Sequence, residues 1–366
     1  MSELHLDSLE IKNFRCFEHL TIEKLGRVNL IVGKNSVGKT CLLEAIRIYA
    51  TNANFPDLMW ILAERGEVSP GVSSDLSIKP DHLTSLFYNM NFEVGRSIIQ
   101  IGDGKRIEKN VSIKLEYFLE DNNNRAILKV IETKDVIDAE NLQIGFSLSL
   151  GNRSKIYRFP LSSTRIPENR IFGDFIKKCV FVPCNGLNKY FLPVYWDGVV
   201  MDGQEDSVLV ALRLLDSDIE RFHVVSNPET PNERFAVVKT RKFDKPIRLR
   251  NLGDGMMRIS GIAIAIVQAK NGYFLIDEFD NGLHHSIQLE AWRFIFRISK
   301  ELNAQVFATT HSWDCVEAFQ EAAAEDHNEE AMLIRLQQKR SGEGIEAVLY
   351  DEELLAKATR QQVEVR

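Results

Sequence analysis

The chain has 366 residues, of which 27% are charged and 44% hydrophobic, and its formal net charge is −7 at pH 7. These proportions are typical of a soluble globular protein and exclude one that coats nucleic acid by bulk charge, although a local basic patch stays possible. Its five cysteines are scattered, so we expect neither a disulfide framework nor structural zinc. Without a run long enough to span a membrane or a signal-peptide pattern, we expect a cytoplasmic protein that contacts no membrane.

Residues 4–25 alternate between apolar and polar side chains, which predicts two strands of a hairpin. Within it, Arg15 is flanked by Phe14 and Phe17. Arg15 could face a nucleotide base or phosphate, and it could equally be a solvent-facing residue beside two core aromatic rings.

Residues 28–50 are the most informative stretch. A β-branched run predicts a buried strand, residues 33–40 match G-x-x-x-x-G-K-[ST], and a helical pattern starts immediately afterwards. Gly33 and Gly38 allow the backbone N–H groups to face a polyphosphate, and the helix N-terminus adds its partial positive charge. We therefore predict an ATP site that comprises Gly33, Lys34, Asn35, Ser36, Val37, Gly38, Lys39, Thr40 and Cys41.

Two side chains of this loop have specific predicted roles. Lys39 would reach the β- and γ-phosphates of ATP, and the hydroxyl of Thr40 would bind Mg²⁺.

The middle of the chain changes pattern. Residues 51–92 are irregular, whereas several short alternating segments between 97 and 165 predict an antiparallel sheet inserted in the nucleotide domain. The expected strands are 97–101, 111–119, 126–131, 144–150 and 156–159. A long heptad-patterned helix is missing from this region, so we do not expect a coiled-coil arm.

A buried strand at 178–183, a polar loop at 184–192 and a helix at 207–221 follow. A hairpin then pairs residues 235–239 with 245–249. This region carries a basic cluster, which is either a DNA-binding surface or a solvated hairpin face: Arg241, Lys242, Lys245, Arg248 and Arg250.

Residues 252–256, Leu-Gly-Asp-Gly-Met, precede a long apolar helix. Gly253, Asp254 and Gly255 could be an ordinary helix cap, but a helix N-terminus is also an anion site. Capping the γ-phosphate held by a second subunit would give this loop a purpose, and that arrangement predicts a head-to-tail dimer around two ATP molecules.

The apolar run 273–276 predicts a buried parallel strand that ends in Asp277 and Glu278. Asp277 would hold Mg²⁺ opposite Thr40, and Glu278 would orient and deprotonate the attacking water. His311 follows the next predicted strand, 305–309, and should lie beside the γ-phosphate at the same sheet edge.

Together, the stretches 33–40, 252–256, 275–278 and 310–311 resemble the ABC-type ATPase heads of the RecF, Rad50, SMC and OLD group, and most closely the OLD-like ATPases of prokaryotic defence systems. The resemblance implies an α/β P-loop fold with a mixed central sheet, an antiparallel β insert and a helical signature lobe. It also implies that residues 253–255 act in trans.

The family pattern is incomplete in this chain. The signature lacks the usual serine, and a clear Q-loop glutamine is missing, so that Asn185 is the candidate for that position. The resemblance places His284 where many ABC proteins carry the D-loop aspartate.

We expect one ABC-type ATPase domain that spans the chain in five parts. These are a P-loop half (1–50), a β-rich insert (51–180), a helical and hairpin lobe (181–255), a half with Asp277 and His311 (256–315) and an α/β tail (316–366). The sequence after His311 is too short for a Toprim nuclease domain of ordinary size, so we expect that nuclease to be missing or supplied by another protein.

The predicted function is therefore a Mg-ATP-hydrolysing ATPase that dimerises and controls a partner effector, a Toprim or HNH nuclease, in phage defence or DNA maintenance. A RecF-like repair ATPase that binds DNA directly is the alternative. A transporter ATPase subunit is the third reading.

Overall fold

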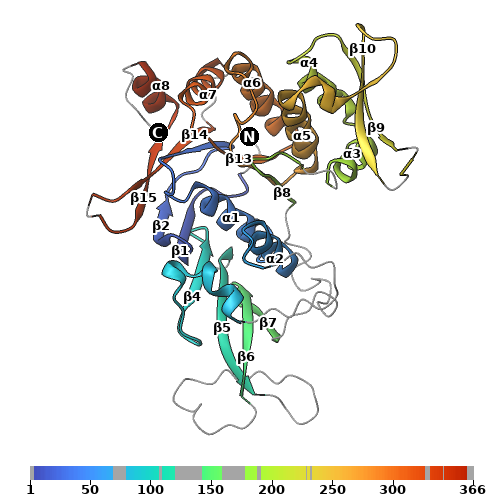
Figure 1. Ribbon diagram of the computed structural model, residues 1–366. Coiled ribbons are helices and arrows are strands. Elements are labelled where there is room, and N and C mark those ends of the chain that lie inside the picture. The colour runs from blue at the N-terminus through green and yellow to red at the C-terminus, as the bar shows by residue number, and fades with distance from the viewer. Residues whose placement is uncertain are drawn as a thin grey trace.

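A computed structural model describes most of the chain (Figure 1). The described residues are 4–68, 80–106, 109–119, 142–158, 178–187, 191–227, 229–230, 233–325, 330–340 and 342–360. The strand expected at 126–131 lies outside these ranges. Among the described residues, none of the helices combines the length and the apolar character needed to cross a membrane.

A six-stranded central sheet has the order β15-β14-β3-β13-β12-β8. Its strands are β3 (Val28–Val32), β8 (Cys179–Val182), β12 (Tyr273–Ile276), β13 (Gln305–Thr309), β14 (Ala331–Gln338) and β15 (Ile345–Tyr350). All neighbours run parallel except the edge strand β15. Every residue of β3, β12 and β13 is buried, which explains their nearly continuous apolar sequences.

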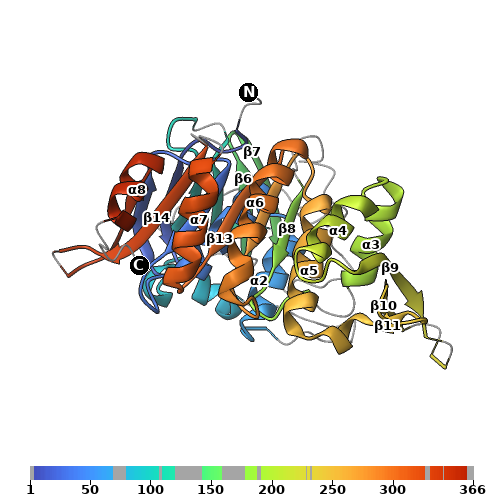
Figure 2. The ribbon, with the colours of Figure 1, turned by 90° about the horizontal axis from the view of Figure 1, so that it is seen from above.

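Helices cover both faces of this sheet, so the molecule has two hydrophobic cores (Figures 1 and 2). One core packs Leu30 of β3 against α5 (Asp254–Gln268), α6 (His285–Glu301), α7 (Trp313–Glu325) and α8 (Glu352–Arg360). The other packs Ile31 against α1 (Lys39–Ala50) and α2 (Phe55–Glu64). Successive residues of β3 thus enter opposite cores, as the period of a strand requires.

A second sheet is antiparallel and has the order β2-β1-β4-β5-β6-β7. Its strands are β1 (Leu9–Phe14), β2 (Phe17–Ile22), β4 (Ile98–Gly102), β5 (Val111–Leu119), β6 (Leu142–Leu150) and β7 (Arg153–Arg158). Because β1 pairs with β4, the inserted strands extend the N-terminal hairpin. The 3₁₀ helices η1 (Pro80–Leu86) and η2 (Tyr88–Met90) precede β4.

A lateral lobe lies beside α5 (Figure 2). It contains α3 (Phe191–Met201), α4 (Glu205–Arg213), β9 (Ile219–Ser226), β10 (Arg234–Thr240), β11 (Ile247–Arg248) and η7 (Leu249–Leu252). The prediction of a helix over 207–221 is wrong beyond Arg213. A turn follows, in which the N–H of Asp218 donates to the side chain of Asp216, and Ile219 then begins a strand.

Gln305 connects the start of β13 to the N-terminal segment. Its side chain is fully buried, and its Nε2 donates to the carbonyl oxygens of Leu6 and Gly26, each at 2.8 Å. The N–H of Leu6 donates to its Oε1 at 2.9 Å. If the amide were removed, the N–H and carbonyl groups of Leu6 would lose this partner, whereas the carbonyl oxygen of Gly26 would keep the hydrogen bond that it accepts from Nδ2 of Asn29.

We therefore expect Gln305→Leu to lower the free energy of unfolding by about 2–4 kcal/mol, because a buried polar group without a partner costs about 1–3 kcal/mol. Urea denaturation measures the change. Gln100→Leu, at an exposed position of β4, is the matched control. Equal stability of the two variants would show that the buried amide contributes nothing.

Candidate active site

The phosphate loop, residues 33–40, joins β3 to α1. Gly33 and Gly38 have φ values of 145° and 91°, which favour glycine. A Cβ atom on Gly33 would lie 2.4 Å from the carbonyl oxygen of Leu336, and one on Gly38 would lie 2.4 Å from Sγ of Cys16. Gly38 is the N-cap of α1 and has no side chain to cap it, so the first-turn N–H groups remain available for an anion.

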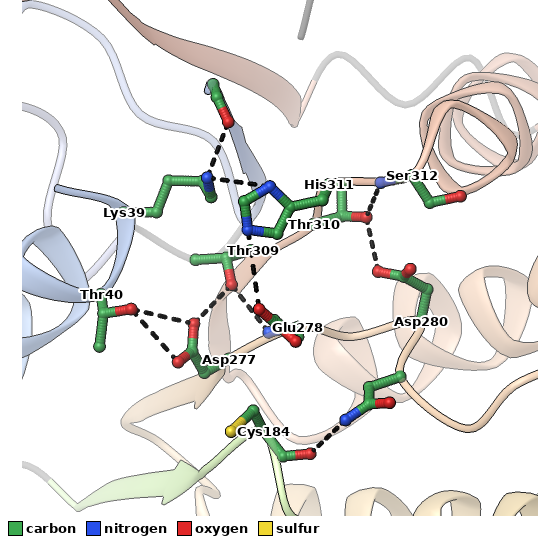
Figure 3. Close-up of polar contacts among 12 residues, drawn as sticks. Lys39, Thr40, Cys184, Asp277, Glu278, Asp280, Thr309, Thr310, His311 and Ser312 are labelled. Carbon is green, nitrogen blue, oxygen red and sulfur yellow. Dashed lines mark hydrogen bonds and ion pairs between the residues drawn. The ribbon is translucent and has the colours of Figure 1, made fainter. Parts of the chain in front are cut away.

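Lys39 extends across this loop (Figure 3). Its Nζ donates to the carbonyl oxygens of Gly33 at 2.7 Å and Lys34 at 3.1 Å, and lies 3.3 Å from Nδ1 of His311. Burial lowers the pKa of the Lys39 ammonium, and the carboxylates of Asp277 and Glu278 act in the opposite direction. Its hydrogen-bond partners are neutral atoms, so its positive charge can pair with a phosphate.

Thr40 and Asp277 face each other from α1 and the end of β12 (Figure 3). The hydroxyl oxygen of Thr40 lies 3.3 and 3.5 Å from the two carboxylate oxygens of Asp277. Hydroxyl and carboxylate oxygens are the ligands that Mg²⁺ prefers, together with substrate phosphates. The donor set therefore fits a magnesium ion.

Thr309, the last residue of β13, fixes the two acidic residues. Its hydroxyl donates to Oδ1 of Asp277 at 2.7 Å and accepts from the N–H of Glu278 at 2.8 Å. The neighbouring Thr310 donates to Asp280 at 2.5 Å. Sequence reasoning missed this bonding and missed Asp280, because neither has a local sequence pattern of its own.

Glu278 and His311 lie together at the open side of the site. Oε1 of Glu278 is 3.6 Å from Nε2 of His311, and both side chains are about two-fifths exposed (43% and 41%). Glu278 has a φ of 48°, a conformation that costs a non-glycine residue about 1–3 kcal/mol. A carboxylate exposed in this way can hydrogen-bond a water molecule, which is what hydrolysis of a phosphoanhydride requires.

Arg258 is a site residue that sequence reasoning missed. It lies in the second turn of α5, and its guanidinium donates to four backbone carbonyl oxygens: those of Pro183 (2.7 Å), Cys184 (3.3 Å), Asp277 (2.7 Å) and Glu278 (2.6 Å). It thus joins the ends of β8 and β12 to the helix that residues 252–256 open. An arginine four residues after Asp254, on the same helical face, was the available signal.

The signature loop, residues 252–256, is exposed at Gly253 and Asp254. It borders a cavity of about 270 Å³ together with Asn185 and Gly282. A larger cavity of about 660 Å³ contains Thr40, Asp277 and Asn185, and the described residues that line it do not include 253–255. The structure thus brings Asn185 beside the proposed magnesium ligands and leaves the signature loop facing solvent.

Two other predicted residues have local roles. His284 is the exposed N-cap of α6, and its Nδ1 accepts from the N–H of Ser286 at 3.3 Å. The Arg15 side chain is buried and pairs with Glu44 at 3.2 Å and Glu67 at 2.5 Å. Arg15 therefore contacts carboxylates, and the structure does not bring its guanidinium to the phosphate loop.

Comparisons with known proteins agree with this geometry. Residues 28–314 match the family described as "AAA domain, putative AbiEii toxin, Type IV TA system". The chain is 22% identical over 348 residues to a Helicobacter pylori protein named ATP/GTP phosphatase, which covers 87% of this chain and 89% of that protein. It is 36% identical over 94 residues to the DNA replication and repair protein RecF of Thermomicrobium roseum, covering 26% of this chain and 22% of RecF.

Two solved structures share the fold. An SMC head bound to the C-winged helix domain of ScpA has a TM-score of 0.52 and 14% identity, with 95% of this chain and 98% of that chain covered. An SMC head with an extended coiled coil, bound to the C-terminal domain of ScpA from Pyrococcus furiosus, has a TM-score of 0.51 and 12% identity, with 98% and 100% covered. The predicted ABC-type α/β fold is confirmed.

We expect Arg258→Met to lower kcat for nucleoside triphosphate hydrolysis about 10–100-fold with little change in KM, since a displacement of about 1 Å in a catalytic group costs up to 100-fold. The phosphate loop, which does not contact Arg258, would still bind nucleotide. Steady-state kinetics separate the two constants.

Arg258→Lys should recover part of kcat, because an ammonium can reach some but not all of the four carbonyl oxygens. Arg297→Met, at an exposed position of α6, is the control. A change in KM alone would contradict a positioning role.

Proposed function

Because the chain belongs to the AAA-domain family that matches residues 28–314, we propose that two copies of this ABC-type ATPase close head-to-tail around Mg-ATP and that the closed dimer controls a separate effector protein. ATP hydrolysis itself accords with the Helicobacter pylori relative, which aligns over most of both chains.

In the proposed reaction Lys39 binds the β- and γ-phosphates. Thr40 and Asp277 would hold Mg²⁺, which neutralises charge on the phosphates when bound. Glu278 orients the attacking water and takes its proton, and His311, which lies between Lys39 and Glu278, contacts the γ-phosphate. The N–H groups that open α1 receive the remaining phosphate charge.

The exposed signature loop carries the dimer proposal. Gly253 has a φ of 95° and no side chain, and nothing lies within 4 Å of the place a Cβ would occupy. The N-terminus of α5 therefore presents uncapped N–H groups to solvent, away from the cavity beside its own Thr40. A second copy that presents its bound γ-phosphate there would satisfy these groups.

The effector proposal follows from what the chain offers for nuclease chemistry. The described residues contain no cluster of three or more His, Cys, Asp or Glu side chains able to hold a metal ion. We therefore propose that the nuclease, of Toprim or HNH type, is a separate chain that responds to the closed dimer.

Direct DNA binding is less well supported, because two cations of the basic cluster pair with carboxylates and a third stacks on an aromatic ring. Lys242 pairs with Asp216 at 3.3 Å and Asp218 at 3.0 Å. Arg241 lies 4.0 Å from Glu220, and the Arg248 guanidinium stacks 4.1 Å from the ring centroid of Phe235. The similarity to RecF covers only a small part of that protein.

We expect Glu278→Gln to bind Mg-ATP and accumulate as a dimer, because the amide cannot take the proton from water and hydrolysis no longer opens the interface. Light scattering coupled to size exclusion measures the mass with ATP and with ADP. Asp254→Trp in the same background, which adds bulk to the exposed loop, should remain monomeric. A monomer of Glu278→Gln at saturating ATP would refute the dimer.

Mixing two inactive variants tests more strictly whether the signature loop of one subunit acts on the ATP site of the other. Lys39→Ala and Asp254→Trp should each hydrolyse little ATP alone. Mixed together they should regain turnover, because one site of the heterodimer combines an intact phosphate loop with an intact signature loop. If the mixture is no more active than the sum of the two variants measured separately, the signature loop of one subunit does not complete the ATP site of the other.

For the effector, we expect this chain with Mg-ATP to leave plasmid DNA intact and to enable cleavage when a candidate Toprim or HNH nuclease is added. Lys39→Ala should abolish that cleavage, since it removes the phosphate contact. Agarose electrophoresis follows the plasmid. Cleavage by this chain alone, or by the nuclease irrespective of nucleotide, would refute effector control.

A further inference from the structure

Two cysteines lie directly behind the phosphate loop, and the proposed reaction does not use their thiols. Cys16 is in the turn between β1 and β2, and Cys41 is in the first turn of α1, immediately after Thr40. The Sγ atom of Cys16 packs against Gly38, the N-cap of α1, and Cys41 follows three residues later on the same face of that helix. The fold therefore brings together two thiols that are far apart in the sequence.

The surroundings of Cys41 favour its reaction with an oxidant. Both residues are partly exposed. Nη2 of Arg65 lies 3.3 Å from Sγ of Cys41 and donates to it. Oxidants react selectively with cysteines that are partly exposed and lie beside a positive charge such as a guanidinium.

The same pair contacts the phosphate loop. Sγ of Cys16 lies 2.4 Å from where a Cβ of Gly38 would stand, and the ring of Phe17 lies 2.9 Å from that point. The turn that carries Cys16 also holds Asn13 and Arg15 at φ values of 55° and 54°. A strained turn thus packs against the loop that would bind ATP.

We propose that Cys16 and Cys41 form a reversible redox switch, in which an intramolecular disulfide ties the β1–β2 turn to α1 and lowers ATP turnover. The effect on turnover rests on the function proposed above. With a peroxide as oxidant, one thiol loses two electrons to the O–O bond and becomes a sulfenic acid, with release of water. The other thiol attacks the sulfenic sulfur, the S–S bond forms, the S–O bond breaks, and a second water leaves. A small dithiol reverses the bond by exchange.

Turnover falls because the bond changes geometry. Both cysteines are free in the structure, and a disulfide requires their sulfurs to approach to about 2.05 Å. The first turn of α1 must then shift relative to the hairpin, and that turn carries Lys39 and Thr40. A displacement of about 1 Å in groups that position a phosphate can cost up to 100-fold in rate.

The experiment treats the reduced full-length chain with hydrogen peroxide, then quenches it and divides the sample. Mass spectrometry of a non-reducing digest detects the peptide that links Cys16 to Cys41. ATP turnover is measured before and after dithiothreitol. The wild type and Cys179→Ser, a control with another partly exposed thiol, should form the linked peptide, lose most of their turnover and regain it on reduction. Cys16→Ser should form no linked peptide and keep its turnover.

Three results would overturn the switch: no linked peptide in the wild type, a linked peptide with unchanged turnover, or the same loss in Cys16→Ser. The last would mean that modification of Cys41 alone inactivates the chain. Detection of the linked peptide does not require ATP, so the experiment tests disulfide formation independently of the proposed ATP-dependent dimer. A chain that forms it but does not dimerise with ATP refutes only the dimer.

Discussion

The parallel pairing of β3, β13 and β12 is the constraint on which the rest of the structure depends. Ile31 of β3 is opposite Thr309 of β13, and Ala308 is opposite Ile276 of β12, so the three strands end at nearly the same level. The phosphate loop, Asp277 and His311 each follow one of these ends. Residues separated by more than two hundred positions therefore meet at one sheet edge without any long-range motif, as is general for ligand sites of parallel sheets.

Two residues at that sheet edge adopt states that cost free energy. Glu278 adopts a left-handed backbone, and Arg258 is a buried cation whose Nε lacks a hydrogen-bond partner among the described residues. Burial lowers the pKa of Arg258, and neighbouring negative groups, including Asp277, oppose this. Such strain persists because the surrounding packing holds these residues in place. Here that packing comes from the fully buried β12 and the apolar part of α5.

Much of the fold and of the candidate site could be predicted from the sequence, because the strongest signals in the sequence are local. A phosphate loop, a buried strand that ends in two acids and a helix opened by glycines each occupy a few consecutive residues. Pairing partners are different: nothing in β1 specifies β4, so the extension of the hairpin by the inserted strands became visible only in the fold. Arg15 had two readings of equal weight, a nucleotide contact and a solvent-facing residue. The structure buries its side chain against Glu44 and Glu67, so Arg15 is not solvent-facing, and its local sequence did not indicate either carboxylate. Thr309 bonds the side chain of Asp277, and Arg258 bonds backbone carbonyl oxygens at the ends of two strands. Which atoms they reach depends on the strand order and not on a local pattern.

The position of Arg258 has a consequence for how two subunits could communicate. Asp254 and Arg258 are four residues apart on one face of α5, and every residue of the helix from Arg258 to Val267 is buried. A buried helix moves as a rigid unit, because its packing leaves few alternative side-chain arrangements. In the proposed dimer, a phosphate of one copy would contact the first turn of α5 in the other. One helical turn further along, the same helix holds the backbone carbonyl oxygens of Asp277 and Glu278. A γ-phosphate bound in one subunit would thereby bias the position of the catalytic carboxylate in its neighbour, which would make the two ATP sites interdependent.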